Sequence, residues 1–260
     1  MAMRNLVGAL LVLMLAACSP KAAGEPSQDL TVFAASSLTD AYQELAAAFE
    51  AQNPSVVVLL NFGGSSTLST QILEGAPADV FASANQAQMQ LIAEAGLLAA
   101  PAPDFASNRL TIIVPADNPA GLQSATDLAQ PGMALVLAAP GVPVREYSDQ
   151  AIAQLGDAEF QAAVYANLVS EEENVRIVVT KVALGEADAG IVYTSDVTPA
   201  VAGDLQQIAI PDEANVIAAY PIAVLAETGN PDLAHTFLDF VLSAAGQVIL
   251  QSWGLGAVSR

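Results

Sequence analysis

Hydrophobic and polar positions along the chain follow two alternating patterns from Leu30 onward. Short apolar runs of strand length are each followed by a longer segment whose apolar residues recur on one helical face. This alternation predicts an α/β protein with largely parallel sheets. In the first part of the chain, strands are expected at 30–34, 56–62 and 79–83, and helices at 38–50, 67–74 and 85–94.

Two strand-like runs farther along the chain, 109–115 and 219–225, resemble each other. We expect each of them to leave one lobe and enter the other. Between them the pattern predicts helices near 125–129, 144–155 and 175–184 and strands at 134–138 and 189–193, and after them helices at 231–242 and 245–253. The predicted first lobe therefore holds residues 29–110 and 220–260, and the predicted second lobe holds 111–219.

The first 17 residues have the pattern of an export signal. Arg4 precedes an apolar stretch, 6–17, that is too short to span a bilayer as a stable anchor. The stretch ends in Leu-Ala-Ala-Cys, which resembles the lipobox of bacterial lipoproteins, so Cys18 is predicted to carry a lipid and 18–28 to be a tether. The alternative is a secreted protein cleaved near Ala17. Cys18 is the only cysteine, which excludes an intrachain disulfide.

The charge balance of the chain is strongly acidic. Seven Lys and Arg residues stand against 27 Asp and Glu residues, for a formal net charge of −20. Nucleic acids and anionic membrane surfaces are recognised through clustered basic residues, so both are poor partners for this chain. A small anion would have to be held by neutral donors and local dipoles.

Two serine pairs, 36–37 and 65–66, each follow a predicted strand and open a predicted helix. A helix N-terminus has unpaired N–H groups and a positive potential, and a serine hydroxyl there adds a donor that can face an anion. The alternative is that Ser37 caps its helix, with Asp40 completing a Ser-x-x-Asp capping box. Gly63 and Gly64 favour the ligand hypothesis because they remove side chains where a ligand needs close backbone approach.

These segments belong to a longer resemblance. The runs TVFAASSL at 31–38, FGGSSTL at 62–68, GAPADVF at 75–81, VPV at 142–144, NVR at 174–176, KVALGEADAGIVY at 181–193 and YPIA at 220–223 resemble the periplasmic molybdate-binding proteins of ABC importers. The resemblance covers nearly the whole chain beyond the export signal. It implies a two-lobed periplasmic-binding-protein fold of type II, with a ligand cleft between the lobes.

The resemblance also implies the ligand and the groups that hold it. A tetrahedral dianion, molybdate or tungstate, would receive hydrogen bonds from the hydroxyls of Ser37, Ser65 and Tyr193 and from the backbone N–H groups of Val144 and Val175. The implied protein is an exported, lipid-anchored monomer that delivers its ligand to the membrane subunits of an importer. It would be no enzyme, would need no cofactor, and would have no side chains that ligate a metal directly.

Several residues have competing interpretations. Glu171, Glu172 and Glu173 are expected to form a solvated acidic first turn of a helix and to point away from the cleft. Arg145 either pairs at the surface with Glu146 or Asp149 or places a positive charge near the anion. Tyr193 could instead fill the surface between the lobes, and His235 is expected on an ordinary helix face.

Three other functions remain open from the residues alone. The first is a binding protein for sulfate or another tetrahedral oxyanion, which only cavity size would separate from molybdate. Hydrogen phosphate is disfavoured because its proton requires an acceptor. The second is a serine hydrolase using Ser37 or Ser65, which lacks a Gly-x-Ser-x-Gly elbow and has only His235 as a histidine base. The third is a structural lipoprotein without a ligand.

Overall fold

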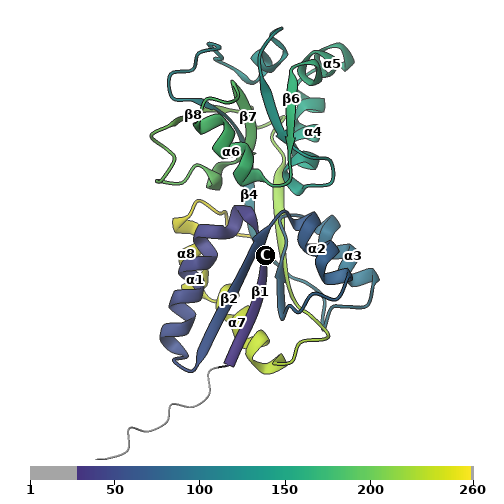
Figure 1. The fold of residues 1–260 in the computed structure, drawn as a ribbon, viewed down its shortest axis with the longest axis vertical. Helices are drawn as coiled ribbons and strands as arrows, with labels where there is room; N and C mark the ends of the chain where they lie inside the picture. Colours follow the sequence, from purple (N-terminus) through teal and green to yellow (C-terminus); the bar gives the residue numbers. More distant parts are fainter. Residues whose placement is uncertain (1–27, 259–260) are drawn as a thin grey trace, which may run out of the picture.

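The computed structural model describes residues 28–258, which form two lobes joined by a pair of long strands (Figure 1). The export signal, Cys18 and the tether as far as residue 27 lie outside the described residues. Gln28, predicted as the end of the tether, is already the first residue of strand β1 (Gln28–Ala35).

The first lobe has a parallel sheet with helices on both faces. Strand β1 pairs in parallel with both β2 and β3. Alternate residues of β1 serve the two faces: Val32 packs in the cluster that contains Phe49 of α1, and Phe33 packs in the cluster that contains Leu68 of α2. The elements besides β1 are β2 (Val56–Gly63), β3 (Val80–Ala82), α1 (Thr39–Gln52), α2 (Ser65–Leu73) and α3 (Gln86–Glu94).

Two antiparallel strands, β4 (Asp104–Pro115) and β9 (Ile217–Val224), connect the lobes (Figure 1). Strand β9 pairs with β3 of the first lobe, and the second half of β4 pairs with β7 and β8 of the second lobe. The strand order is therefore β2-β1-β3-β9-β4-β7-β5-β6, with β8 also beside β4. Within residues 28–258 the chain passes from the first lobe to the second along β4 and returns along β9.

The second lobe repeats the α/β construction. Strand β5 pairs in parallel with β6 and β7, and α6 packs against β5 and β7. Its elements are β5 (Leu135–Ala138), β6 (Leu168–Glu172), β7 (Ala189–Tyr193), β8 (Leu205–Ala209), α4 (Pro143–Leu155), α5 (Ala158–Ala166) and α6 (Val175–Ala183). Short 3₁₀ turns are η1 (Ser36–Leu38), η2 (Ala125–Ala129) and η3 (Thr194–Asp196).

The last two helices, α7 (Pro231–Leu242) and α8 (Ala244–Ser252), return to the first lobe and pack against α1. Phe237 of α7 meets Tyr42 and Phe49 of α1 edge to face, at centroid separations of 6.4 and 5.2 Å. Within residues 28–258 no single helix is long and apolar enough to cross a membrane. Helices α7 and α8 meet that criterion only as a pair, which is bent by 61°.

The predicted two-lobed α/β architecture is confirmed. Three elements escaped prediction: α5, β6 and β8. The prediction that Glu171 and Glu172 belong to the first turn of a helix is wrong, because both lie in β6 and the helix begins only at Val175. The strand β6 was missed because residues 170–172 are polar or acidic and give no apolar run. Such residues are tolerated because β6 lies at the edge of the second lobe's sheet.

Candidate functional site

All five predicted site residues line one small cavity between the lobes. The space is about 10 Å³, roughly what one water molecule needs. Neither a carboxylate nor a basic side chain is among the lining residues in the described part of the chain. The lining residues are Ala35, Ser36, Ser37, Gly64, Ser65, Ala84, Val142, Pro143, Val144, Val175 and Tyr193.

Ser37 lies in η1, directly after the carboxyl end of β1, and is buried. Its hydroxyl caps neither η1 nor α1 within the described residues; its Oγ lies 3.1 Å from the hydroxyl of Tyr220. Asp40 pairs with Arg176 instead of closing a capping box. The helix-cap interpretation of Ser37 is therefore wrong, and the hydroxyl is placed at the cavity by the strand end and by Tyr220.

Ser65 is the first residue of α2, and the preceding position is Gly64, which has no side chain to cap the helix. The Ser65 Oγ accepts a hydrogen bond of 3.0 Å from the backbone N–H of Ala84, two residues beyond the end of strand β3. A hydroxyl that accepts in this way still has its own hydrogen to donate. This bond fixes the position of the Ser65 oxygen and leaves the hydroxyl hydrogen available for another acceptor.

Val144 and Val175 lie in the first turns of α4 and α6, where backbone N–H groups have no partner in their own helix. In α6 the Asn174 side chain accepts from the N–H groups of Arg176 and Ile177, which leaves the N–H of Val175 unused by the cap. In α4 the first position is a proline, and no side chain of residues 28–258 caps the helix. Both N-termini present donors and positive dipole ends to the cavity.

Tyr193 ends β7 and is almost completely buried. Its hydroxyl has no hydrogen-bond partner among the described residues, and its ring packs edge to face on Tyr147 and Tyr220. Burial raises the pKa of Tyr193 well above its ordinary value, and the neighbouring Tyr220, Tyr147 and Asp196 add to the rise. The hydroxyl is therefore protonated at neutral pH and can donate a hydrogen bond to a group that enters the cavity.

The two lobes touch closely around this cavity. A Cβ atom placed on Gly64 would lie 2.5 Å from the carbonyl oxygen of Glu173 in the second lobe. Side-chain hydrogen bonds also cross the gap, among them those from Asn85 Nδ2 to Glu146 Oε2 at 2.7 Å and from Gln88 Nε2 to the carbonyl oxygen of Gly141 at 3.2 Å. Sequence reasoning missed these contacts, because nothing in a linear pattern pairs residues from two lobes.

The acidic residues predicted to avoid the cleft do so. Glu171 and Glu172 are neutralised in pairs, and none of the three glutamates lines the cavity. Arg145 pairs with Asp149, as one alternative predicted, at 2.7 Å, and also with Glu171 at 2.5 Å. The expected surface position of Arg145 is wrong, because the residue is buried and also donates to the carbonyl oxygen of Ala138.

Other chemistry finds little support in the described part of the chain. His235 is exposed on α7 and makes no hydrogen bond to either buried serine, so it is not placed as a general base. Among residues 28–258, no group of three or more His, Cys, Asp and Glu side chains could hold a metal ion.

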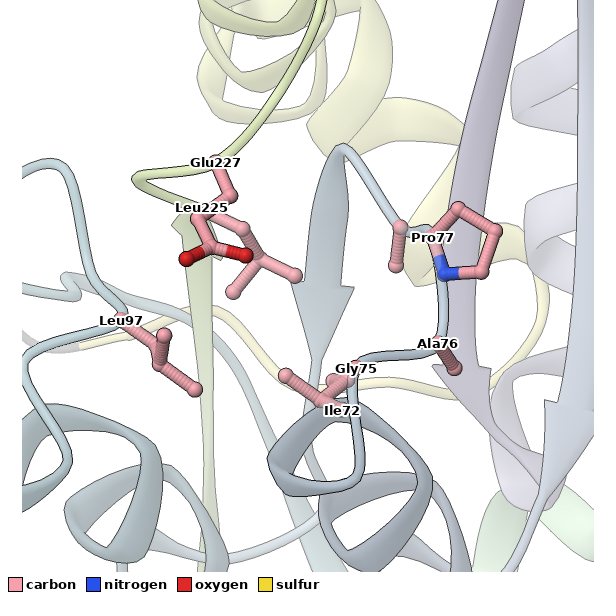
Figure 2. A pocket seen from close by; sticks show the side chains of 8 residues that line it. Ile72, Gly75, Ala76, Pro77, Leu97, Leu225 and Glu227 are labelled. Carbon is pink, nitrogen blue, oxygen red and sulfur yellow. The ribbon is translucent and has the colours of Figure 1, made fainter.

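A larger cavity, of about 190 Å³, opens in the first lobe between the loop after α2 and the end of β9. Figure 2 shows Ile72, Leu97 and Leu225 around it, with the Glu227 carboxylate at its side. Aliphatic side chains and one carboxylate offer an oxyanion no convergent set of donors. The interlobe cavity is therefore the candidate site.

The chain is similar to known solute-binding proteins over most of its length. The family model described as "Bacterial extracellular solute-binding protein" matches residues 30–256. A Mycobacterium tuberculosis protein named "Molybdate-binding protein ModA" is 42% identical over 257 residues, which cover 96% of this chain and 95% of that protein.

Two solved structures show the same fold. The substrate-binding domain of a putative molybdenum ABC transporter from Clostridium difficile has a TM-score of 0.67 and 28% identity, over 89% of this chain and 99% of that one. The sulfate-binding protein SubI of Mycobacterium tuberculosis has a TM-score of 0.79 and 20% identity, over 89% of this chain and 88% of that one.

Proposed function

Because this chain belongs to the family of bacterial extracellular solute-binding proteins, we propose that it captures molybdate or tungstate and delivers it to the membrane subunits of an ABC importer. The strongest support from relatives is the 42% identity with the M. tuberculosis protein named for molybdate binding. Members of this family bind solutes and are not enzymes, so the hydrolase alternative is rejected. The ligand is cargo, and no cofactor is needed.

The observation that carries the proposal is the set of donors around the interlobe cavity. The hydroxyls of Ser37, Ser65 and Tyr193 and the N–H groups of Val144 and Val175 come from both lobes and converge on one space. A dianion that enters loses strong hydration, and hydrogen bonds to a charged group contribute about 1.5 to 3 kcal/mol each. Several such bonds are needed to compensate the lost water, and this donor set provides them without a basic side chain.

The division of donors between the lobes supports a binding cycle. A space of about 10 Å³ admits no tetrahedral oxyanion from outside unless the lobes separate. Bending of the ribbon formed by β4 and β9 would allow this, since in the described part of the chain these two strands alone connect the lobes. The anion then favours the closed arrangement because only that arrangement presents both sets of donors. A closed protein has a shape that an importer can recognise.

A second candidate ligand is sulfate, which is also fully deprotonated at neutral pH and suits a site of donors only. Isothermal titration calorimetry with molybdate, tungstate, sulfate and phosphate tests the proposal. We expect molybdate and tungstate to bind more tightly than sulfate, and phosphate to bind least. Sulfate binding as tightly as molybdate would overturn the assignment, and binding of none of the four would favour a structural lipoprotein.

The serine roles have a direct test in the same experiment. We expect Ser37→Ala and Ser65→Ala each to weaken molybdate binding by about 1 to 3 kcal/mol. Ser66→Ala is the matched control, because Ser66 follows Ser65 in α2 but does not line the cavity. Normal binding by either site variant would remove that serine from the proposed set.

The matched family is described as extracellular, and this chain is therefore an exported protein. We propose further that it is held at the membrane by a lipid on Cys18 and acts as a monomer, since one chain carries the whole donor set. Palmitate labelling of the expressed precursor should require Cys18, and Cys18→Ser should abolish it. Palmitate label retained by Cys18→Ser would contradict the lipid anchor, and a dimer detected by light scattering would contradict the monomer.

A further inference from the structure

A chain of buried hydrogen bonds runs behind Ser37, away from the cavity. Asn108 Nδ2, on β4, lies 3.3 Å from the hydroxyl of Tyr220, on β9, and that hydroxyl lies 3.1 Å from Ser37 Oγ. All three residues are buried. The two strands that connect the lobes thus reach one of the proposed ligand groups through two side chains.

The surroundings of Asn108 fix which end of its amide faces Tyr220. Its Oδ1 accepts from the backbone N–H of Arg109 at 3.0 Å and from the hydroxyl of Thr194 at 3.1 Å. The Nδ2 atom therefore points the other way, toward Tyr220 and toward Ser195 Oγ at 2.8 Å. An amide nitrogen only donates, so the Tyr220 oxygen is the acceptor in this contact.

The direction of the next bond follows from where the Tyr220 hydrogen can go. Within residues 28–258 its hydroxyl has two hydrogen-bond neighbours, Asn108 and Ser37. The rings of Tyr193 and Tyr220 pack at 5.7 Å, but no group among the described residues lies within hydrogen-bond distance of the Tyr193 hydroxyl. If Ser37 donated to Tyr220, the buried Tyr220 hydrogen would have no acceptor, which is costly. Tyr220 therefore donates to Ser37.

We propose that Tyr220 is a positioning residue that turns the Ser37 hydroxyl hydrogen into the cavity, with Asn108 orienting Tyr220 in turn. Ser37 accepts from Tyr220 just as Ser65 accepts from the N–H of Ala84, so both serines keep one hydrogen for the anion. This inference rests on the proposed oxyanion function. It adds that the direction in which the serine hydroxyls donate is set by groups that do not contact the ligand.

The arrangement also bears on selectivity. A hydrogen phosphate ion carries a proton that needs an acceptor, and the bond from Tyr220 already takes one of the two lone pairs of the Ser37 oxygen. Removal of the Tyr220 hydroxyl would free that lone pair and would let the Ser37 hydroxyl rotate. Molybdate should then bind less tightly, and phosphate should be disfavoured less strongly.

Tyr220→Phe tests the inference by calorimetry with molybdate and phosphate. Phenylalanine keeps the ring that packs against Phe105 and Tyr193, and the melting midpoint reports whether the fold is kept. We expect molybdate binding to weaken about 3- to 10-fold, the loss of one ordinary hydrogen bond, and the ratio of molybdate to phosphate affinity to fall. Tyr42→Phe is the control, because Tyr42 is equally buried in the first lobe but lies outside the cavity.

A double-mutant cycle separates this role from a merely structural one. If Tyr220 acts through Ser37, Tyr220→Phe should have no further effect on molybdate affinity in a Ser37→Ala background. Likewise, Asn108→Ala should have no further effect in a Tyr220→Phe background. The positioning role would be overturned if Tyr220→Phe weakened molybdate binding equally in the wild-type and Ser37→Ala proteins. It would also be overturned if Tyr220→Phe left both affinity and selectivity unchanged. Neither result would affect the proposed oxyanion function. Failure of the wild-type protein to bind any oxyanion would overturn the proposed function itself.

Discussion

Arg176 Nη2 donates to Asp40 Oδ2 across the gap between the lobes at a distance of 2.6 Å. Arg176 follows Val175 at the start of α6, and Asp40 lies in the first turn of α1, just beyond Ser37. Their side chains are 26% and 30% exposed, so solvent screens the pair only in part. The pair therefore ties together the two helix ends that present Val175 and Ser37 to the cavity.

This ion pair should stabilise the closed arrangement and so contribute to ligand affinity. We expect a double-mutant cycle of Asp40→Asn and Arg176→Gln to give a coupling of about 1 kcal/mol in the free energy of molybdate binding. The cycle is needed because each single change also alters the charge near a dianion. Calorimetry on the four proteins measures the coupling, which should decrease as salt is added.

The pair Lys181–Glu172, at 2.5 Å, is the matched control because both partners belong to the second lobe. A cycle of Lys181→Gln and Glu172→Gln should show coupling in the free energy of unfolding but none in molybdate binding. If the two cycles gave equal coupling in the free energy of molybdate binding, or if neither gave any, the Arg176–Asp40 pair would not stabilise the closed arrangement of the lobes.

The fold was predictable where hydrophobic spacing was clear. The strand before Ser37 and the helix after it were placed within a few residues, because β1 and α1 bury regular apolar faces. The strands β6 and β8 were missed because polar residues interrupt both of them, at 170–172 in β6 and at 206–207 in β8, so neither is a continuous apolar run. Helix α5 was missed because its apolar residues have little helical asymmetry, and only Val164 among them is fully buried.

The site was predictable only in part. Serine pairs at strand ends and the collinear resemblance selected residues that the fold brings to one cavity. The roles of Tyr220 and Asn108 were not foreseen, because they depend on contacts between positions more than 100 residues apart. Gly64 was noted for ligand approach, yet its closest neighbour is the Glu173 carbonyl of the opposite lobe. Such pairings are decided by tertiary packing, which a linear pattern does not encode.

Gly64 should be required for the lobes to close. Its φ and ψ of −61° and 136° are open to any residue, so Gly64→Ala should leave the first lobe stable. The added Cβ would lie 2.5 Å from the Glu173 carbonyl oxygen and would hold the lobes apart. We expect molybdate affinity to fall at least about tenfold, or 1.4 kcal/mol, by calorimetry, with an unchanged melting midpoint of the protein alone.

Gly63→Ala is the control for this steric effect. A Cβ on Gly63 would meet only the flexible Leu68 side chain of the same lobe, at 3.2 Å. Its affinity for molybdate should therefore stay close to that of the wild-type protein. Wild-type affinity in Gly64→Ala would mean that binding does not need this close contact between the lobes.

Tyr193→Phe should change stability and affinity in opposite directions. The Tyr193 hydroxyl is buried and has no partner among the described residues, so its removal should raise the free energy of unfolding by about 1 kcal/mol. The same change removes a donor to the anion and should weaken molybdate binding by about 1.5 to 3 kcal/mol. Urea unfolding of the protein alone and calorimetry measure the two effects.

Tyr42→Phe again provides the comparison, because the Tyr42 hydroxyl is also buried without a partner in the described part of the chain. It should gain stability in the same way and keep its molybdate affinity. Unchanged affinity in Tyr193→Phe would leave Tyr193 as a residue that fills the surface between the lobes.

Asp196 should make stability depend on pH in the weakly acidic range. Burial raises the pKa of Asp196 to about 6, although Arg176, 3.2 Å away, and the N–H of Tyr193 oppose the rise. The folded state thus binds a proton more tightly than the unfolded chain does. The stability from this group is complete below the ordinary pKa near 4 and is lost as the pH rises through 6, by about 3 kcal/mol in total.

Asp196→Asn isolates this contribution because asparagine keeps an acceptor for the Tyr193 N–H but does not ionise. From pH 4 to pH 7, the wild-type protein should lose about 3 kcal/mol of unfolding free energy relative to the variant, measured by urea unfolding. Asp127→Asn should behave oppositely, because backbone N–H bonds from Gln123 and Ser124 lower the pKa of Asp127. There the wild-type advantage should be present above about pH 5 and should be lost as the pH falls through the pKa of Asp127 in the folded state. A constant difference between wild type and Asp196→Asn across this range would mean that Asp196 is already ionised at pH 4.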